Sequence, residues 1–177
     1  MRRPLVAALI LLGCAGKLFT ITVEDSAETV VPRGTVLEDL VGQLGFGDFL
    51  NMDITSSEEL ANQGVEPGDI VEVYLSDFVL TATDPPGADL SFLERVDVLV
   101  SAPDLPEKRI ASAVGFQKGV AQITFDLENV DLTDYVVSKS MTLRTDVEGR
   151  SPNQNTTVVA DFAVDVGVTA KGVCNNL

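Results

Sequence analysis

The feature that most constrains this chain is a run from position 158 to 168 in which every second residue is apolar. Two acids, Asp161 and Asp165, occupy positions between them. Successive side chains of a β-strand point to opposite faces, so a period of two puts all the apolar side chains on one face. That face requires a second apolar layer to cover it. The apolar positions are Val158, Ala160, Phe162, Val164, Val166 and Val168.

Similar apolar runs recur along the chain and are bounded by turn residues. They lie at residues 18–23, 28–31, 50–54, 70–83, 96–100, 110–116, 120–127, 141–147 and 158–168. The predicted strands are not regularly separated by predicted helices. We therefore predict one mostly β domain over residues 18–177, an antiparallel β-sandwich or flattened barrel with about eight or nine strands.

Two capping boxes predict about two short helices in the N-terminal third. The first, Thr35 to Glu38, opens an apolar helical face that ends near Gly45. The second, Ser56 to Glu59, opens a shorter helix that stops at Gly64.

The run at residues 70–83 is longer than a usual strand, and its apolar phase changes midway. The change predicts a bulge or bend near Ser76 and Asp77, with the two halves facing opposite ways. The apolar positions are Val71, Val73 and Leu75 before it, and Phe78, Leu80 and Ala82 after it. Glu66–Asp69 fits a type II turn, and Lys118 with Gly119 fits a tight hairpin.

The N-terminus has the layout of a secretory signal. Arg2 and Arg3 precede an apolar run from Leu5 to Leu12, which is too short to span a bilayer. The segment Leu11-Leu12-Gly13-Cys14 resembles the lipobox of bacterial lipoproteins. The alternatives are an ordinary signal peptide and an uncleaved anchor.

The lipoprotein resemblance implies how the chain is processed and where it resides. Residues 1–13 would be a signal peptide, recognised through Leu11, Leu12 and Gly13. Signal peptidase II would cut before Cys14, which would carry the acyl chains. Residues 14–17 would be a short tether that holds the domain close to the membrane. Ala15, in place of an aspartate, favours the outer membrane of the bacterial envelope.

The chain is strongly acidic, with a formal net charge of −15. Removing Arg2 and Arg3 with the signal peptide leaves a net charge of −17, because the signal contains no acid. A field of this sign repels phosphate backbones, so nucleic acid is not an expected partner. The acids are interpreted as a solvated or salt-adapted surface, with a cationic ligand as the alternative.

The residue types give no signature of catalysis. The chain contains no histidine, which removes Ser-His-Asp and Cys-His arrangements and every zinc site built with histidine. A hydrolase with paired carboxylates is open on residue types alone, although no spacing supports one. The densest acidic cluster has no calcium-loop spacing and is interpreted as an exposed strand end. Its members are Asp126, Glu128, Asp131 and Asp134.

We therefore expect no catalytic residues, no cofactor and no metal. If Cys14 is acylated, Cys174 is a lone thiol without a disulfide partner; otherwise the two cysteines are available to pair.

The leading hypothesis is a non-catalytic envelope lipoprotein, acting as a structural or protein-binding module at the membrane surface. It would contact the membrane through its acyl chains and a protein partner through an exposed strand edge. The alternative is a carrier of a small hydrophobic ligand or lipid, with the apolar face of residues 158–168 lining the pocket.

Overall fold

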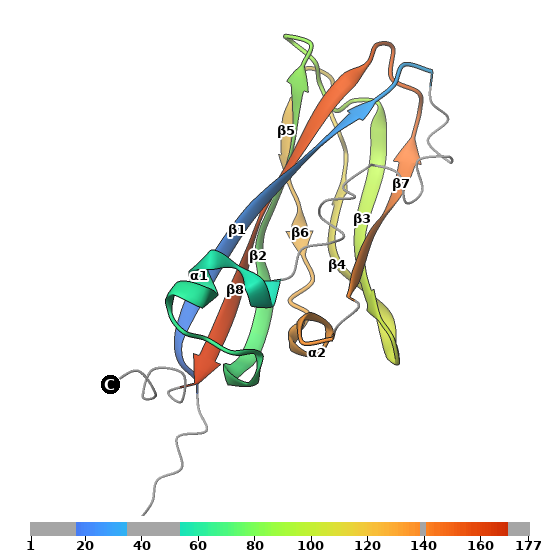
Figure 1. The fold of residues 1–177 in the computed structure, drawn as a ribbon. Coiled ribbons are helices and arrows are strands. Elements are labelled where there is room, and N and C mark those ends of the chain that lie inside the picture. The colour runs from blue at the N-terminus through green and yellow to red at the C-terminus, as the bar shows by residue number, and fades with distance from the viewer. Residues whose placement is uncertain (1–16, 35–53, 139–140, 170–177) are drawn as a thin grey trace, which may run out of the picture.

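The computed structural model describes residues 17–34, 54–138 and 141–169. They form two antiparallel sheets of four strands that pack face to face, which confirms the predicted β-sandwich (Figure 1). Sheet A has the order β1-β8-β2-β5, and sheet B has the order β6-β4-β3-β7. The core between them is filled by buried aliphatic and aromatic side chains from both sheets.

Sheet A contains β1 (Lys17–Val31), β8 (Thr156–Thr169), β2 (Ile70–Asp84) and β5 (Gln122–Thr124). Sheet B contains β6 (Asp126–Leu127), β4 (Leu105–Val114), β3 (Leu93–Ala102) and β7 (Thr142–Gly149). The helical elements are the 3-10 turns η3 (Ile54–Ser56) and η4 (Pro67–Asp69) and the short helices α1 (Glu58–Asn62) and α2 (Thr133–Val136). Figure 1 shows α1 and α2 at the end of the sandwich where β1 begins.

Strand β8 is central in sheet A, between β1 and β2. All six of the alternating apolar side chains predicted to share a face are buried, with exposed fractions of 0 to 5%. Asp161 lies on the opposite, solvent-facing side. The period-two pattern therefore identified both the strand and its buried face.

Strand β1 corrects the prediction of two strands at residues 18–23 and 28–31. It is continuous over 15 residues. Its register with β8 runs without a break from Phe19 opposite Val168 to Val31 opposite Thr156. The polar residues that suggested an interruption continue the strand because each lies opposite a residue of β8 in an unbroken antiparallel register.

Strand β2 contains the predicted bulge, but the predicted faces were wrong. Its register with β8 shifts between Leu75 and Asp77. The extra residue restores the original phase, so Val73 and Phe78 both face the core. A second shift between Ile70 and Glu72 turns Val71 out to solvent, where its exposed fraction is 38%.

Both predicted turns were wrong in detail. Glu66–Asp69 forms a 3-10 turn closed by a capping box, in which the Glu66 N–H donates to Asp69 Oδ2 over 3.2 Å. The chain does turn near Lys118 and Gly119, but the strands on either side lie in different sheets. The returning segment pairs first with β2, because the 115–121 loop crosses from one layer to the other.

Helix α1 confirms the second predicted helix, with its cap one residue later than predicted. The Ser57 side chain accepts from the Leu60 N–H over 3.3 Å, and the chain turns at Gly64 with a φ of 65°. Ile54 lies in η3 and not in a strand. Helix α2 lies outside the N-terminal third and was not predicted. The predicted helix at residues 35–45 lies outside the described residues.

The two sides of the sandwich differ. On one side β5 continues into β6 through Phe125, so one segment pairs with β2 in sheet A and then with β4 in sheet B. On the other side the outermost strands are β1 and β7, which pair within the described residues only with β8 and β3. The first side is closed by covalent continuity, whereas the second presents two strand edges.

Candidate functional site

The predicted anchor residues, Leu11 to Cys14, lie outside the described residues. The first described residue, Lys17, is the first residue of β1. An anchor at Cys14 would therefore hold the end of the sandwich where β1 begins. Within the described part of the chain, no helix has the length and hydropathy to cross a membrane.

The open edge of β1 is the first candidate site. Its inner face is anchored in the core by Val23, Ala27 and Val31, each less than 10% exposed. The opposite face carries polar residues, including Glu24 and Glu28, which are exposed. An edge strand of this length presents a long row of backbone N–H and C=O groups to which another extended chain can pair.

The first residues of β1 are held to the sheet by an ion pair that spans β8. The Lys17 ammonium contacts Glu72 on β2. The Glu72 side chain passes over Gly167, where an added Cβ would lie 2.4 Å from Glu72 Cγ. Gly167 is thus needed for the close passage of this side chain, which fixes the start of the edge strand.

The second open edge, β7, differs from β1 in its charges. Its outer face presents Arg144, Asp146 and Glu148 in alternate positions. Arg144 forms a two-pronged ion pair with Glu107 of β4, with N–O distances of 2.8 and 2.7 Å. This bond lowers the pKa of Glu107 and raises that of Arg144. Mixed charges on a short strand are typical of edges that are protected against pairing.

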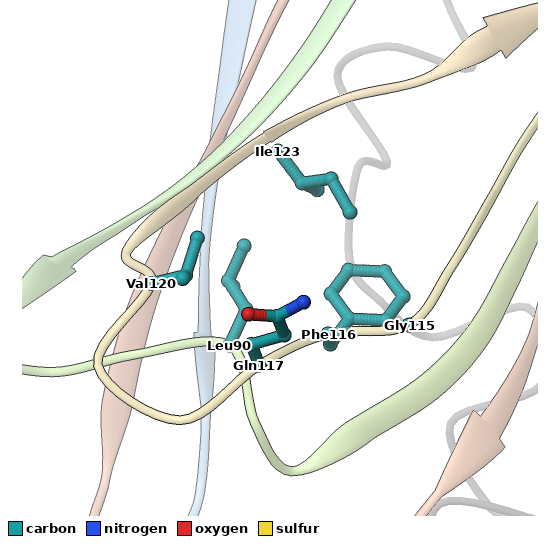
Figure 2. A pocket seen from close by; sticks show the side chains of 6 residues that line it. All are labelled: Leu90, Gly115, Phe116, Gln117, Val120 and Ile123. Carbon is teal, nitrogen blue, oxygen red and sulfur yellow. The ribbon is translucent and has the colours of Figure 1, made fainter.

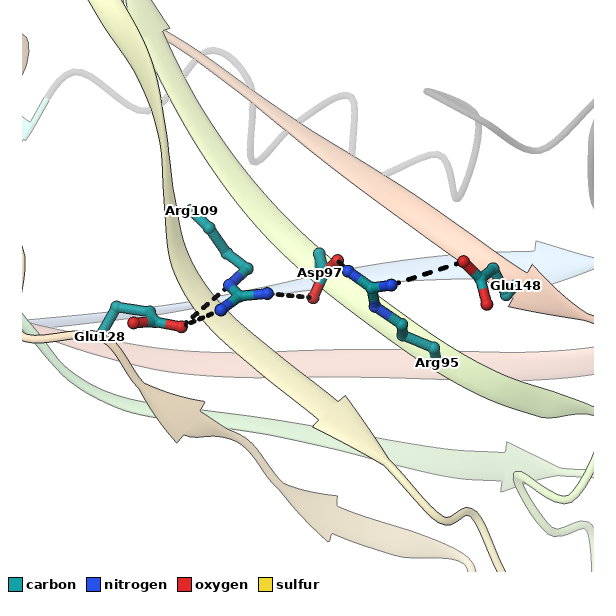
Figure 3. Close-up of polar contacts among 5 residues, drawn as sticks. All are labelled: Arg95, Asp97, Arg109, Glu128 and Glu148. Carbon is teal, nitrogen blue, oxygen red and sulfur yellow. Dashed lines mark hydrogen bonds and ion pairs between the residues drawn. The ribbon is translucent and has the colours of Figure 1, made fainter.

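A charged ladder crosses the outer face of sheet B (Figure 3). It runs in the order Glu128, Arg109, Asp97, Arg95, Glu148, and successive members form ion pairs. The Asp97 carboxylate at its centre is only 7% exposed. Its Oδ1 has no hydrogen-bond partner and lies 3.6 Å from an Arg109 nitrogen. The hydrogen bond to Asp97 raises the pKa of Arg95.

The sequence did not identify this ladder, because its members come from three strands, β3, β4 and β7, and from the residue that follows β6. The local signal was the charge at alternate positions 95 and 97, on either side of the apolar Val96. All its members except Asp97 are substantially exposed. Its geometry pairs strands to one another and leaves no open carboxylate pair for general acid and base catalysis.

The acidic cluster at residues 126–134 is divided among separate partners. Glu128 pairs with Arg109, whereas Asp131 accepts from the Thr133 N–H at 2.9 Å at the start of α2. Burial raises the pKa of Asp131, whereas the hydrogen bonds from Thr133 lower it. The net shift of the Asp131 pKa is downward. Within residues 17–34, 54–138 and 141–169, no three Cys, Asp or Glu side chains lie close enough together to hold a metal ion.

Two cavities lie at the end of the sandwich opposite Lys17. The first, the apolar end pocket, has a volume of about 260 Å³ (Figure 2). The second, the polar end pocket, has a volume of about 180 Å³ and is also lined by residues of the 87–92 loop. The apolar end pocket is lined by Leu90, Gly115, Phe116, Gln117, Val120 and Ile123.

The face that was expected to line a carrier pocket does not line either cavity. Residues 158–168 are packed against the opposite sheet as core. The residues around the two cavities come mainly from loops, which carry no periodic signal. No protein-family model matches this chain, and no curated protein matches its sequence.

Proposed function

We propose that this protein is a non-catalytic, lipid-anchored module of the bacterial envelope that binds another protein along the open edge of β1. One observation carries the proposal: β1 extends for 15 residues and, in the described structure, pairs along one side only. Backbone pairing supplies affinity that does not depend on the partner's side chains, and the outer face then selects the partner.

The anchor supports this role by its position. Cys14 precedes Lys17 by three residues, which reach about 10 Å when extended. Two or more acyl chains on Cys14 would give stable membrane attachment. Strand β1, about 45 Å long at about 3.3 Å per residue, would then run from the membrane surface outward. A partner strand paired with it would be close to the same membrane.

The charge of β1 indicates the chemistry of the partner. Glu24, Asp25 and Glu28 are exposed, and the strand's only base, Lys17, is occupied by Glu72. Antiparallel pairing of two β1 strands would place acids near acids, which is destabilising. The proposed partner is therefore a different protein with an extended segment that carries lysine or arginine.

Site-specific photo-crosslinking in the native host tests this proposal. A photoreactive residue at Glu28 on β1 is expected to give one discrete adduct with a partner protein. The matched control is Asp77, which is also exposed but lies on β2, two strands away from the edge. Equal adducts from both positions, or none from Glu28, would contradict binding at the edge.

A second candidate function, carriage of a small hydrophobic ligand, is favoured only by the apolar end pocket. Its volume of about 260 Å³ is below the 300–1,000 Å³ typical of sites that enclose a drug-sized ligand. The test is uptake of a fluorescent fatty acid by the full-length protein. Saturable uptake that Val120→Trp abolishes and Val114→Trp leaves intact would support carriage. Val120 lines the pocket, whereas Val114 does not.

A further inference from the structure

Three cations at one end of the sandwich are not neutralised by an ion pair. Of the eight lysines and arginines in the described residues, four pair with a carboxylate, and Lys108 lies over the Tyr135 ring. The other three are Arg33, Lys118 and Arg150, and all are exposed. They lie in loops at the end opposite Lys17. In a chain of net charge −15, this grouping is unexpected.

Two of these cations, Lys118 and Arg150, line the polar end pocket. Among the described residues that line it, Asp89 is the only acid, and both of its carboxylate oxygens accept hydrogen bonds. Oδ1 accepts from the Ser91 N–H at 3.0 Å, and Oδ2 accepts from the Gly119 N–H at 2.7 Å. With two cations against one carboxylate, the described wall of the pocket has an excess of positive charge.

Hydrogen bonds fix the walls of this pocket. The pKa of Asp89 is lowered mainly by its bonds to Ser91 and Gly119, and these bonds tie the 87–92 loop to the 115–121 loop. The Arg150 N–H donates to Phe92 O, and its guanidinium donates to Ser91 O, both at 2.8 Å. These bonds preorganise the pocket before any ligand binds.

The remaining polar groups match a hydroxylated anion. Lys118 has three N–H donors, and the Arg150 guanidinium has four beyond its bond to Ser91. The side-chain amides of Asn153 and Gln154 also line the pocket and can both donate and accept. Among the described residues of the wall, Phe92 is the only aromatic one, and it is buried, so these residues present no exposed ring on which a sugar can stack.

From this geometry we infer that the polar end pocket binds a small sugar that carries a negative group. Lys118 and Arg150 bind the carboxylate or phosphate, and the amides bind ring hydroxyls. Because the described wall offers no ring for stacking, binding depends on the charge, and a neutral sugar is not retained. The inference does not depend on partner binding by β1, because the pocket lies at the end of the sandwich and uses no residue of that strand.

The test is a saturation-transfer NMR titration of the full-length protein in micelles of lauryldimethylamine oxide, a detergent without sugar. The probes are D-glucuronate and D-glucose 6-phosphate, with D-glucose, acetate and inorganic phosphate as comparisons. Saturable binding of either sugar anion, without binding of glucose, is expected. Which of the two binds identifies the negative group.

The variant Lys118→Gln should weaken that binding about tenfold, the usual effect of losing one charge-assisted hydrogen bond. Lys108→Gln, the matched control, makes the same charge change outside the pocket and should leave binding unchanged. Arg150→Lys retains the charge without the guanidinium fork, so it should weaken binding less than Arg150→Gln.

Four results would overturn the inference. They are no saturable binding of either sugar anion at tens of millimolar, equal binding of glucose, equal binding of acetate or phosphate alone, and equal weakening by the Lys118 and Lys108 variants. The equilibrium unfolding of each variant is measured alongside, so that loss of binding is not mistaken for loss of fold.

Discussion

The closed side of the sandwich depends on Phe125, and its replacement gives a quantitative prediction. Phe125 is 4% exposed and lies between β5 and β6, where the chain passes from sheet A to sheet B. Its N–H donates to Phe78 O at 2.9 Å, and the two rings lie 4.7 Å apart in a tilted arrangement. The side chain therefore joins the two layers on the side where the backbone crosses.

Phe125→Ala should lower the free energy of unfolding by about 3–5 kcal/mol, because it removes a buried ring and leaves a cavity. At a slope of about 2 kcal/mol per molar urea, the midpoint would fall by about 2 M. If the variant is too unstable to measure, Phe125→Leu retains most of the volume. A double-mutant cycle with Phe78→Leu should then give a coupling of about 0.5–1.5 kcal/mol.

Urea unfolding followed by far-UV circular dichroism measures these quantities. Phe116→Ala is the matched control, since Phe116 is only partly buried beside the apolar end pocket. It should cost clearly less than Phe125→Ala. A cost below about 1 kcal/mol for Phe125→Ala, within the range of ordinary substitutions, would refute the assignment of Phe125 as the residue that closes this side.

Three further predictions concern charge and anchoring. Asp97→Asn should lower the free energy of unfolding by about 1–3 kcal/mol in urea titrations, because it removes the carboxylate between two guanidiniums, whereas exposed Asp146→Asn should have little effect. The folded pKa values of Asp89, Glu107 and Asp131 are lowered. Their contribution to stability is therefore complete above the unfolded pKa of about 4 and is lost as the pH falls through the lower folded values, so unfolding at pH 3 should require less urea than at pH 6. Intact mass of protein from the host membrane should show a chain that starts at Cys14 with added acyl mass; a chain cleaved elsewhere without acyl mass would contradict the anchor.

Local periodicity was enough to predict the fold class. In strands β3, β7 and β8, the apolar side chains at alternate positions are buried, as their pattern predicted. Helix α1 begins directly after its serine N-cap. These features depend on neighbours within a few residues, so a single sequence contains them. The continuity of β1 was missed because its middle is polar, and it becomes a strand only through pairing with β8, more than a hundred residues away.

The candidate sites were harder to predict, because they join distant segments. Arg109 and Glu128 are 19 residues apart in the sequence and form an ion pair, and Lys118 and Arg150 are 32 residues apart and line the same pocket. The two halves of β2 were predicted to face opposite ways, but the bulge adds one residue between them. The apolar side chains after the bulge therefore face the same way as those before it. A weak signal was available for the polar end pocket, since Lys118 and Arg150 both occur in turns at strand ends.

Hydrogen exchange of the β1 amides, measured on the protein in native membranes and again after purification in detergent, tests the central claim most directly. Alternate N–H groups of an antiparallel strand point to opposite edges, so those directed away from β8 are available to a partner. The account predicts slow exchange at these amides in the membrane and fast exchange after purification, with β8 amides unchanged. Equal exchange of β1 in the two preparations would contradict binding of a partner along its edge.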